Sequence, residues 1–198
     1  MLGSMTGSEV IRKRMRRREV DGGLRFITFS CHRRIPLFSS PSVAWVFVRA
    51  MASARVRRKF RLIAWVVMPE HIHMIILPPD GEPLAKILAG IKTSVAKHCI
   101  GRWTEMRARI LDRLADGNGT PRFWQRGGGF DRNIRGTAEL CREIRYTHRN
   151  PVERGLVDRP EVWRWSSVRW WMGVRDQEVE CDLPPGDDEV WKRWREFV

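Results

Sequence analysis

The sequence predicts an α+β fold in which helices alternate with hairpin strands. The apolar runs 62–68 and 71–78 are separated only by Pro69 and Glu70, which indicates a β-hairpin. Residues 82–103 place apolar side chains three, four and seven positions apart, which is typical of an amphipathic helix. The chain has 198 residues, of which 42% are hydrophobic, and this suffices for one globular domain with a sizeable core.

The elements ahead of this hairpin are a strand and a helix. Residues 24–30 alternate in character and are rich in aromatic and β-branched side chains, which predicts a strand. Pro36 and Pro41 then bracket a turn. Residues 42–59 have apolar positions at helical spacing and a basic end, which favours a helix.

The second half of the chain is predicted to be less regular. Residues 104–122 end in DGNGTPR and are expected to form a poorly ordered insertion. Residues 122–135 predict another strand beside a glycine loop. Residues 137–150 predict a helix that Pro151 ends, and an aromatic-rich segment of turns and helix follows.

The charge of the chain points to an acidic partner. The net charge is +14 and the isoelectric point is about 11, so nucleic acid is the first candidate. Only six of the 37 basic residues are lysine. Arginine binds phosphate bidentately, although GC-rich codon usage would give the same bias. The charge is also uneven, which predicts a flexible basic arm at 1–20, a domain at 21–173 and an acidic tail at 174–198.

The sequence contains no sign of a membrane segment or of a disulfide framework. No stretch reaches the roughly 18 to 20 apolar residues of a membrane span, and the N-terminus lacks the apolar core of a signal peptide. We therefore expect a cytoplasmic protein without a membrane partner. The four cysteines are far apart and form no C-x-x-C pair, so we expect reduced, buried thiols.

The tripeptide His71, Ile72 and His73 is the first candidate for chemistry. Residues two apart on a strand point to the same face, so both imidazoles can reach one metal ion while Ile72 faces the core of a half-buried sheet. Two polar histidines on an exposed sheet face would give the same pattern. The tripeptide alone therefore leaves both interpretations open.

Tyr146, the only tyrosine, is the second candidate. Leu140 and Ile144 mark the apolar stripe of the helix, and Tyr146 lies about 200° around the helix from Ile144. Its ring is therefore expected away from the core, on the side of Arg142 and Asn150. One helix could then bring a phenol nucleophile and an amide oxygen to the same place, although a half-exposed surface aromatic is the alternative.

Several motifs in this order resemble the REP-associated tyrosine transposases, which belong to the single-tyrosine HUH transposases of the IS-two-hundred-like group. The motifs are WVVMPEHIH at 65–73, FWQR at 123–126, FDRNIR at 130–135, YTHRNPVERGL at 146–156 and WRWSS at 163–167. The resemblance runs from about Leu24 to Gly173. It implies an antiparallel sheet of four to five strands sandwiched with helices, in the ferredoxin-like (RRM-like) HUH fold.

The resemblance also implies an activity. The chain is expected to be a metal-dependent transposase, acting as a monomer or a homodimer, that nicks and rejoins single-stranded DNA through a 5′-phosphotyrosine, at hairpin-forming repeats. Tyr146 matches the nucleophile of the family. His71, His73 and Asn150 match the ligands of a divalent metal ion, for which Mg²⁺ or Mn²⁺ is expected, and Gln125 and His148 are alternative ligands.

The contacts with single-stranded or hairpin DNA are less sharply predicted. The candidate phosphate contacts are Lys92, Arg126, Arg132 and Arg135. The run 127–129 is richer in glycine than the family pattern, which allows a backbone to approach phosphate but is also typical of a flexible loop. Glu70 is either a partner of His71 or, as the sequence alone favours, a residue of the hairpin turn.

Two other functions remain open on the sequence. The chain could be a repeat-DNA-binding regulator without catalysis, or a metal-dependent nuclease that uses water while Tyr146 plays no part.

Overall fold

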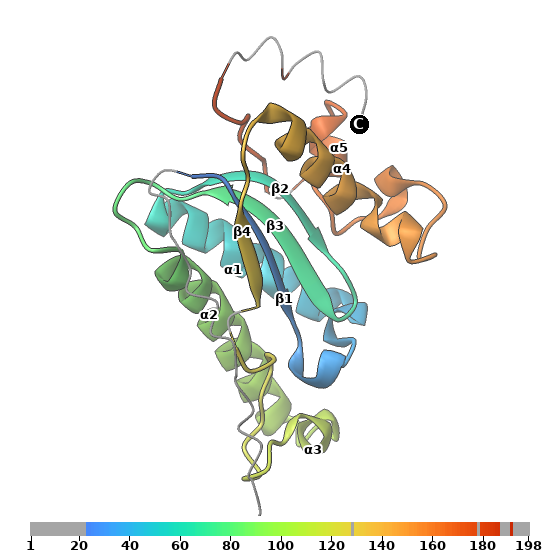
Figure 1. Ribbon diagram of the computed structural model, residues 1–198. Coiled ribbons are helices and arrows are strands. Elements are labelled where there is room, and N and C mark those ends of the chain that lie inside the picture. The colour runs from blue at the N-terminus through green and yellow to red at the C-terminus, as the bar shows by residue number, and fades with distance from the viewer. Residues whose placement is uncertain (1–22, 128, 178, 187–190, 192–198) are drawn as a thin grey trace, which may run out of the picture.

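The core of the protein is a four-stranded antiparallel sheet (Figure 1). The structure is a computed structural model, and it describes residues 23–127, 129–177, 179–186 and 191. The strand order is β2-β3-β1-β4, which confirms the predicted antiparallel sheet. The strands are β1 (Arg25–Ser30), β2 (Arg61–Val67), β3 (His71–Leu77) and β4 (Phe130–Asn133). The basic arm predicted at 1–20 lies outside the described residues.

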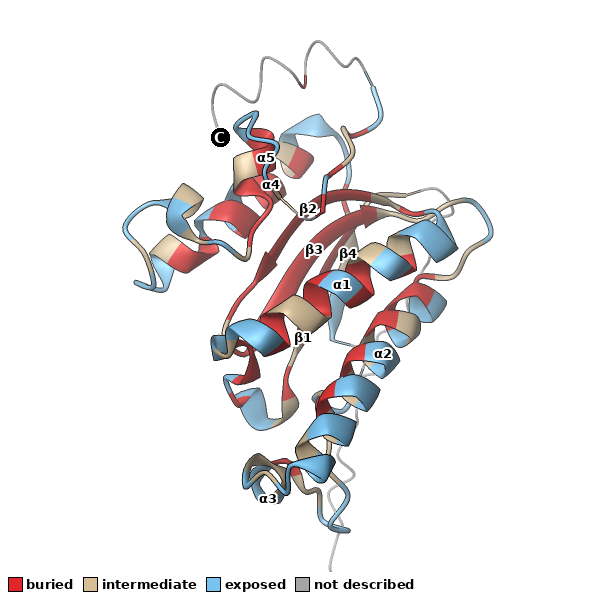
Figure 2. Cartoon of the chain, turned by 180° about the vertical axis from the view of Figure 1, so that it is seen from behind, coloured by how far each residue is buried: buried red, intermediate tan, exposed pale blue. Residues whose placement is uncertain are grey.

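Helices cover both faces of the sheet. The helices α1 (Pro41–Arg58) and α2 (Leu84–Glu105) lie across one face, as Figure 2 shows from behind. The helix α4 (Thr137–Glu153) contacts β2 and β3 from the other side. The short helix α5 (Val168–Trp171) follows it near the end of the described chain. The half-buried sheet expected from the histidine pattern is therefore wrong: β3 is buried on both faces because α4 closes over the second one.

The predicted hairpin is confirmed. The strands β2 and β3 pair antiparallel, and the N–H of Met68 donates to the carbonyl of His71 at 2.8 Å to close the turn. Ile72 pairs with Phe29 of β1, whose ring packs on Phe47 of α1 at 6.1 Å between centroids. Ile72 therefore faces the core beneath α1, as predicted, and the two histidines face α4.

The segment 104–122, expected to be poorly ordered, contains the short helix α3 (Ile110–Leu114) and a closed turn. The carboxylate of Asp116 accepts the backbone N–H groups of Asn118 and Thr120, each at 3.0 Å, and pairs with Arg122 at 2.5 Å. Leu114 is fully buried in the core. The expectation was wrong because a single carboxylate satisfies the backbone of a turn whose Gly and Asn content suggested disorder.

Pro151 does not end α4, which continues to Glu153. A proline removes its own backbone donor and so costs one helical hydrogen bond, but the residues that follow it can still close the last turn. The N–H of Arg154 donates to the carbonyl of Asn150, and that of Leu156 donates to Pro151. The helix predicted for 137–150 is therefore confirmed with a later end.

Residues 182 and 183 of the acidic segment 174–198 lie beside the start of β2 at its outer edge. Asp182 forms two hydrogen bonds with the backbone of Leu62, each 2.7 Å, and an ion pair of 2.7 Å with Arg55 of α1. Val179 and Cys181 are buried beside it. These contacts cover backbone groups of an edge strand that would otherwise be free to pair with another chain.

All four cysteines are free thiols. Cys31, Cys99 and Cys181 are buried and Cys141 is half-buried, which largely confirms the expected burial. Burial raises the pKa of Cys31, Cys99 and Cys181 to about 12. Within the part of the chain that the structure describes, no helix is long and apolar enough to cross a membrane.

Candidate active site

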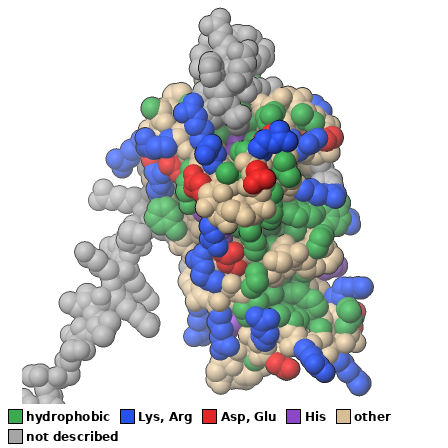
Figure 3. Space-filling view, turned by 90° about the vertical axis from the view of Figure 1, so that its right-hand side faces the viewer, with side chains coloured by type: hydrophobic (Ala, Val, Ile, Leu, Met, Phe, Trp, Pro, Cys, Tyr) green, Lys and Arg blue, Asp and Glu red, His purple; other side chains and the backbone are tan. Residues whose placement is uncertain are grey.

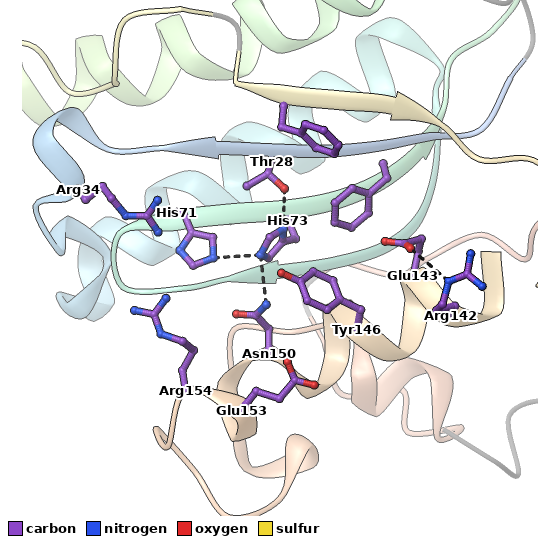
Figure 4. A pocket seen from close by; sticks show the side chains of 12 residues that line it. Thr28, Arg34, His71, His73, Arg142, Glu143, Tyr146, Asn150, Glu153 and Arg154 are labelled. Atoms are coloured by element: carbon purple, nitrogen blue, oxygen red, sulfur yellow. Dashed lines mark hydrogen bonds and ion pairs between the residues drawn. The ribbon is translucent and has the colours of Figure 1, made fainter. Parts of the chain in front are cut away.

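The four residues singled out for chemistry lie in one cleft of about 790 Å³ between α4 and the sheet (Figure 4). His71 and His73 enter it from β3, and Tyr146 and Asn150 enter it from α4. Phe26 and Thr28 of β1 form part of its wall.

The Nε2 atoms of the two histidines face each other. The Nε2 atoms of His71 and His73 are 3.0 Å apart, with the rings nearly perpendicular at 87°. Each Nδ1 atom has another partner: His71 Nδ1 lies 3.1 Å from a carboxylate oxygen of Glu70, and His73 Nδ1 lies 2.7 Å from the hydroxyl of Thr28. Because a carboxylate only accepts, Nδ1 of His71 carries the proton and its Nε2 presents a lone pair to the cleft.

This arrangement fits a divalent metal ion. Two neighbouring ligands of an octahedral ion at about 2.1 Å lie about 3 Å apart, which matches the separation of the two Nε2 atoms. The side chain of Asn150 is 3.3 Å from His73 Nε2, and its buried Oδ1 has no hydrogen-bond partner. A 180° flip of the Asn150 amide would exchange its oxygen and nitrogen and so place Oδ1 next to His73 Nε2. Among the described residues no group of three His, Cys, Asp or Glu side chains could hold a metal, so a third side-chain ligand at this place would have to be the amide of Asn150.

Burial keeps both histidines neutral at neutral pH. It lowers the pKa of His73 to about 3, with a smaller contribution from His71, and it also lowers the pKa of His71 against the opposing effect of Glu70. Neutral imidazole is the form that binds metal.

Glu70 lies in the hairpin turn, as the sequence favoured, and its buried carboxylate is also a partner of His71. Its Oε1 atom also accepts from Arg34 at 3.3 Å and from Arg154 at 3.1 Å. Burial opposes ionisation of this carboxylate, but His71, Arg154 and Arg34 outweigh it and lower its pKa. Glu70 thus fixes the ring of His71 and ties it to the end of α4, in the way that partners of metal-binding histidines do.

Tyr146 lies where the helical spacing placed it. Ile144 and Leu140 are buried, whereas the side chain of Tyr146 is 41% exposed. Its ring lies 5.3 Å from that of His73 and points into the cleft beside Asn150 (Figure 4).

The four predicted phosphate contacts fall into two pairs. Lys92 and Arg126 line a second cavity of about 250 Å³ that adjoins the first. Arg132 is instead held by two carboxylates of α4, those of Glu139 and Glu143. The N–H of Arg135 donates to Glu139 at 2.6 Å. Of the four predicted phosphate contacts, Lys92 and Arg126 are therefore the two that line the cavity next to the candidate active site.

The two alternative ligands do not join the histidine pair. His148 lies on the inner side of α4, with Nε2 3.0 Å from the hydroxyl of Ser167. Gln125 lines the second cavity, where its side-chain oxygen accepts the N–H of Arg33 at 3.0 Å.

Arg154, Thr28 and Arg34 are among the cleft residues that were not foreseen. Arg154 lies one helical turn after Asn150, so the spacing that linked Tyr146 to Asn150 would have found it. Thr28 and Arg34 reach the cleft through strand pairing and a short turn. No local pattern in the sequence signals such long-range placement.

The fold and the paired histidines on β3 agree with the comparison against known families. The sequence model described as "Transposase IS200 like" matches residues 25–127, just over half of the chain, and the matched part contains both histidines. The chain belongs to the IS200-like transposase family, and it is a transposase by that membership.

Two named relatives and one solved structure agree with this family assignment. The chain is 27% identical over 154 residues to a REP-associated tyrosine transposase of Escherichia coli (strain K12), covering 77% of this chain and 80% of that protein. A Haemophilus influenzae protein provisionally given the same name is 24% identical over 173 residues, covering 87% and 90%. The fold also matches a solved REP-associated tyrosine transposase bound to a REP hairpin, with a TM-score of 0.63 and 24% identity over 87% of this chain and 93% of that one.

Proposed function

We propose that this transposase nicks and rejoins single-stranded DNA at hairpin-forming repeats, with Tyr146 as the nucleophile. The observation that carries the proposal is the convergence of one phenol, two facing imidazoles and one unpartnered amide oxygen in a single cleft. The REP hairpin bound by the solved structural neighbour supports a folded DNA repeat as the substrate.

The reaction follows from the groups present. The phenolic oxygen of Tyr146 attacks the scissile phosphorus, so that a bond from tyrosine to phosphorus forms and the bond to the 3′ oxygen breaks. The phenol loses its proton and the leaving oxygen gains one. The products are a 5′-phosphotyrosine and a free 3′-hydroxyl. Because the covalent link preserves the energy of the broken bond, a 3′-hydroxyl can reverse the step and join strands without ATP.

The neighbouring residues prepare the phosphate for this attack. We propose that His71, His73 and Asn150 hold Mg²⁺ or Mn²⁺, which when bound supplies a positive charge to a non-bridging phosphate oxygen. Glu70 and Thr28 hold the two imidazoles in orientation. Arg34 and Arg154 border the cleft and add positive charge to it.

The surface charge suits a polyanion. Lys and Arg side chains are spread over the side of the molecule seen in Figure 3, with fewer acidic ones between them. The excess of positive charge, +14 over the chain, favours DNA binding that weakens as salt increases.

The test is capture of DNA on the protein. A pool of single-stranded DNA labelled at its 3′ end is incubated with the protein and Mn²⁺ and then separated on a denaturing gel. The wild-type protein should retain the label, because the 3′ fragment stays on the tyrosine. Since Tyr146 is the only tyrosine in the chain, Tyr146→Phe removes every phenol and should abolish capture.

The same gel separates the alternatives. A nuclease that uses water would release labelled fragments without capture. Its Tyr146→Phe variant would still cleave the DNA. A regulator without catalysis would give neither fragments nor capture. Either result would contradict the proposed mechanism.

A further inference from the structure

The second cavity lies beside the candidate active site and shares part of its wall. Thr28, Arg34 and Phe130 line both the cleft of about 790 Å³ and the cavity of about 250 Å³. The smaller volume is below that of a typical pocket for a drug-sized ligand, so it suits one small unit of a longer chain.

Strand register places Phe130 in line with the metal-binding face. Thr28 pairs with His73 on one side and with Phe130 on the other, so these three side chains form a row across β3, β1 and β4. Neighbouring strands are about 4.8 Å apart, which puts Phe130 roughly 10 Å from His73 along that row. A group bound at Phe130 is therefore next to a group bound at the histidines.

Phe130 is an exposed aromatic ring at this position. Its side chain is 47% exposed, and its contact with the ring of Phe26 is edge-on at 6.5 Å between centroids, so a face is not covered by Phe26. Exposed rings in a basic groove are the surfaces on which unpaired bases stack.

The cavity is basic. Arg34, Lys92 and Arg126 line it, and none of its described lining residues is acidic. Lys92 is held in place by the ring of Phe29, whose centroid is 4.6 Å from its Nζ atom. Basic side chains of this kind position a nucleic acid through its phosphates.

The glycine at position 129 has a structural reason. Gly129 has φ +75°, and a Cβ atom there would lie 2.3 Å from the carbonyl oxygen of Thr28. Only glycine lets the chain approach β1 so closely and enter β4 with Phe130 opposite Thr28.

We propose that this cavity is a subsite for the unpaired nucleotide adjacent to the scissile phosphate, with its base stacked on Phe130 and its phosphate held by Lys92 and Arg126. The inference rests on the proposed function, because the cleft beside it must hold DNA. It adds a substrate contact that does not depend on the tyrosine chemistry.

The test measures binding in the absence of cleavage. A short fluorescein-labelled oligo-dT is titrated by anisotropy with the Tyr146→Phe protein, without metal. Adding Phe130→Leu should weaken binding about 5- to 150-fold, the usual range for loss of one base stack, whereas Phe130→Trp should retain it. An abasic strand of the same length should bind equally to the proteins with and without Phe130→Leu, because it offers no base to stack.

The charged part of the subsite has a matched control on the same helix. Lys92→Met should weaken binding and reduce the salt dependence by about one phosphate contact, whereas Lys86→Met, an exposed α2 residue outside both cavities, should do neither. Equal oligo-dT binding with and without Phe130→Leu, or equal effects of the two lysine changes, would overturn the subsite.

The binding experiment and the capture gel test the two proposals independently. If capture fails but binding still depends on Phe130, the subsite remains and the tyrosine mechanism is wrong. If capture succeeds and Phe130→Leu has no effect on oligo-dT binding, the mechanism remains and the subsite is wrong.

Discussion

Acidification should destabilise this protein through His148, the histidine that anchors α4 from inside. The side chain is only 2% exposed. His148 Nε2 lies 3.0 Å from the hydroxyl of Ser167, which also accepts the backbone N–H of Trp65 at 2.9 Å. The other nitrogen, Nδ1, is buried without a hydrogen-bond partner. A proton placed there would have no acceptor, and burial accordingly lowers the pKa of His148 to about 3.

The direction and size of the effect follow from this pKa. The unfolded chain has an ordinary histidine pKa near 6.5, so it binds a proton that the folded chain refuses between pH 6.5 and about 3. The stability is therefore complete above pH 6.5 and declines below it. pH 5 lies about 1.5 units below the pKa of the unfolded chain, so the free energy of unfolding is lower there by about 2 kcal/mol than above pH 6.5. This value changes little if the folded pKa is a unit higher.

Urea denaturation at pH 8 and pH 5 measures this loss. The free energy of unfolding of the wild type should fall by about 2 kcal/mol more between these two pH values than that of His148→Gln. His71 and His73 titrate in both proteins, so their contributions cancel in the comparison. Equal losses in the two proteins would refute the reasoning, as would a nuclear magnetic resonance titration that shows His148 protonating near pH 6 in the folded state.

Three further outcomes are expected. His71→Ala combined with His73→Ala should abolish calorimetric binding of Mn²⁺ while the circular dichroism spectrum is retained, and unchanged affinity would exclude these ligands. Gly129→Ala should cost about 1–3 kcal/mol in urea denaturation, because a Cβ atom would meet Thr28 and φ is +75°; a neutral result would contradict the close approach of the strands. Asp182→Ala should cost about 1–3 kcal/mol, since a backbone donor of β2 loses its partner, and an unchanged urea midpoint would show that water replaces the carboxylate.

Local spacing in the sequence was sufficient to place the candidate site residues on common faces. A strand has a period of two, so His71 and His73 had to share a face opposite Ile72. A helix turns 100° per residue, so Tyr146 had to leave the stripe of Ile144 and accompany Asn150. These geometric relations hold within a single element whatever the rest of the chain does, and the structure agrees with them.

Only the tertiary structure decided what surrounds these residues. The pairing of β1 between β3 and β4 brings Thr28 to His73 and aligns Phe130 with both, although the three positions are far apart in the sequence. The same holds for Glu70, whose two arginine partners come from separate segments. Such contacts depend on strand register and on which faces are covered. Those features are set by burial of the whole core, and no short stretch of sequence records them.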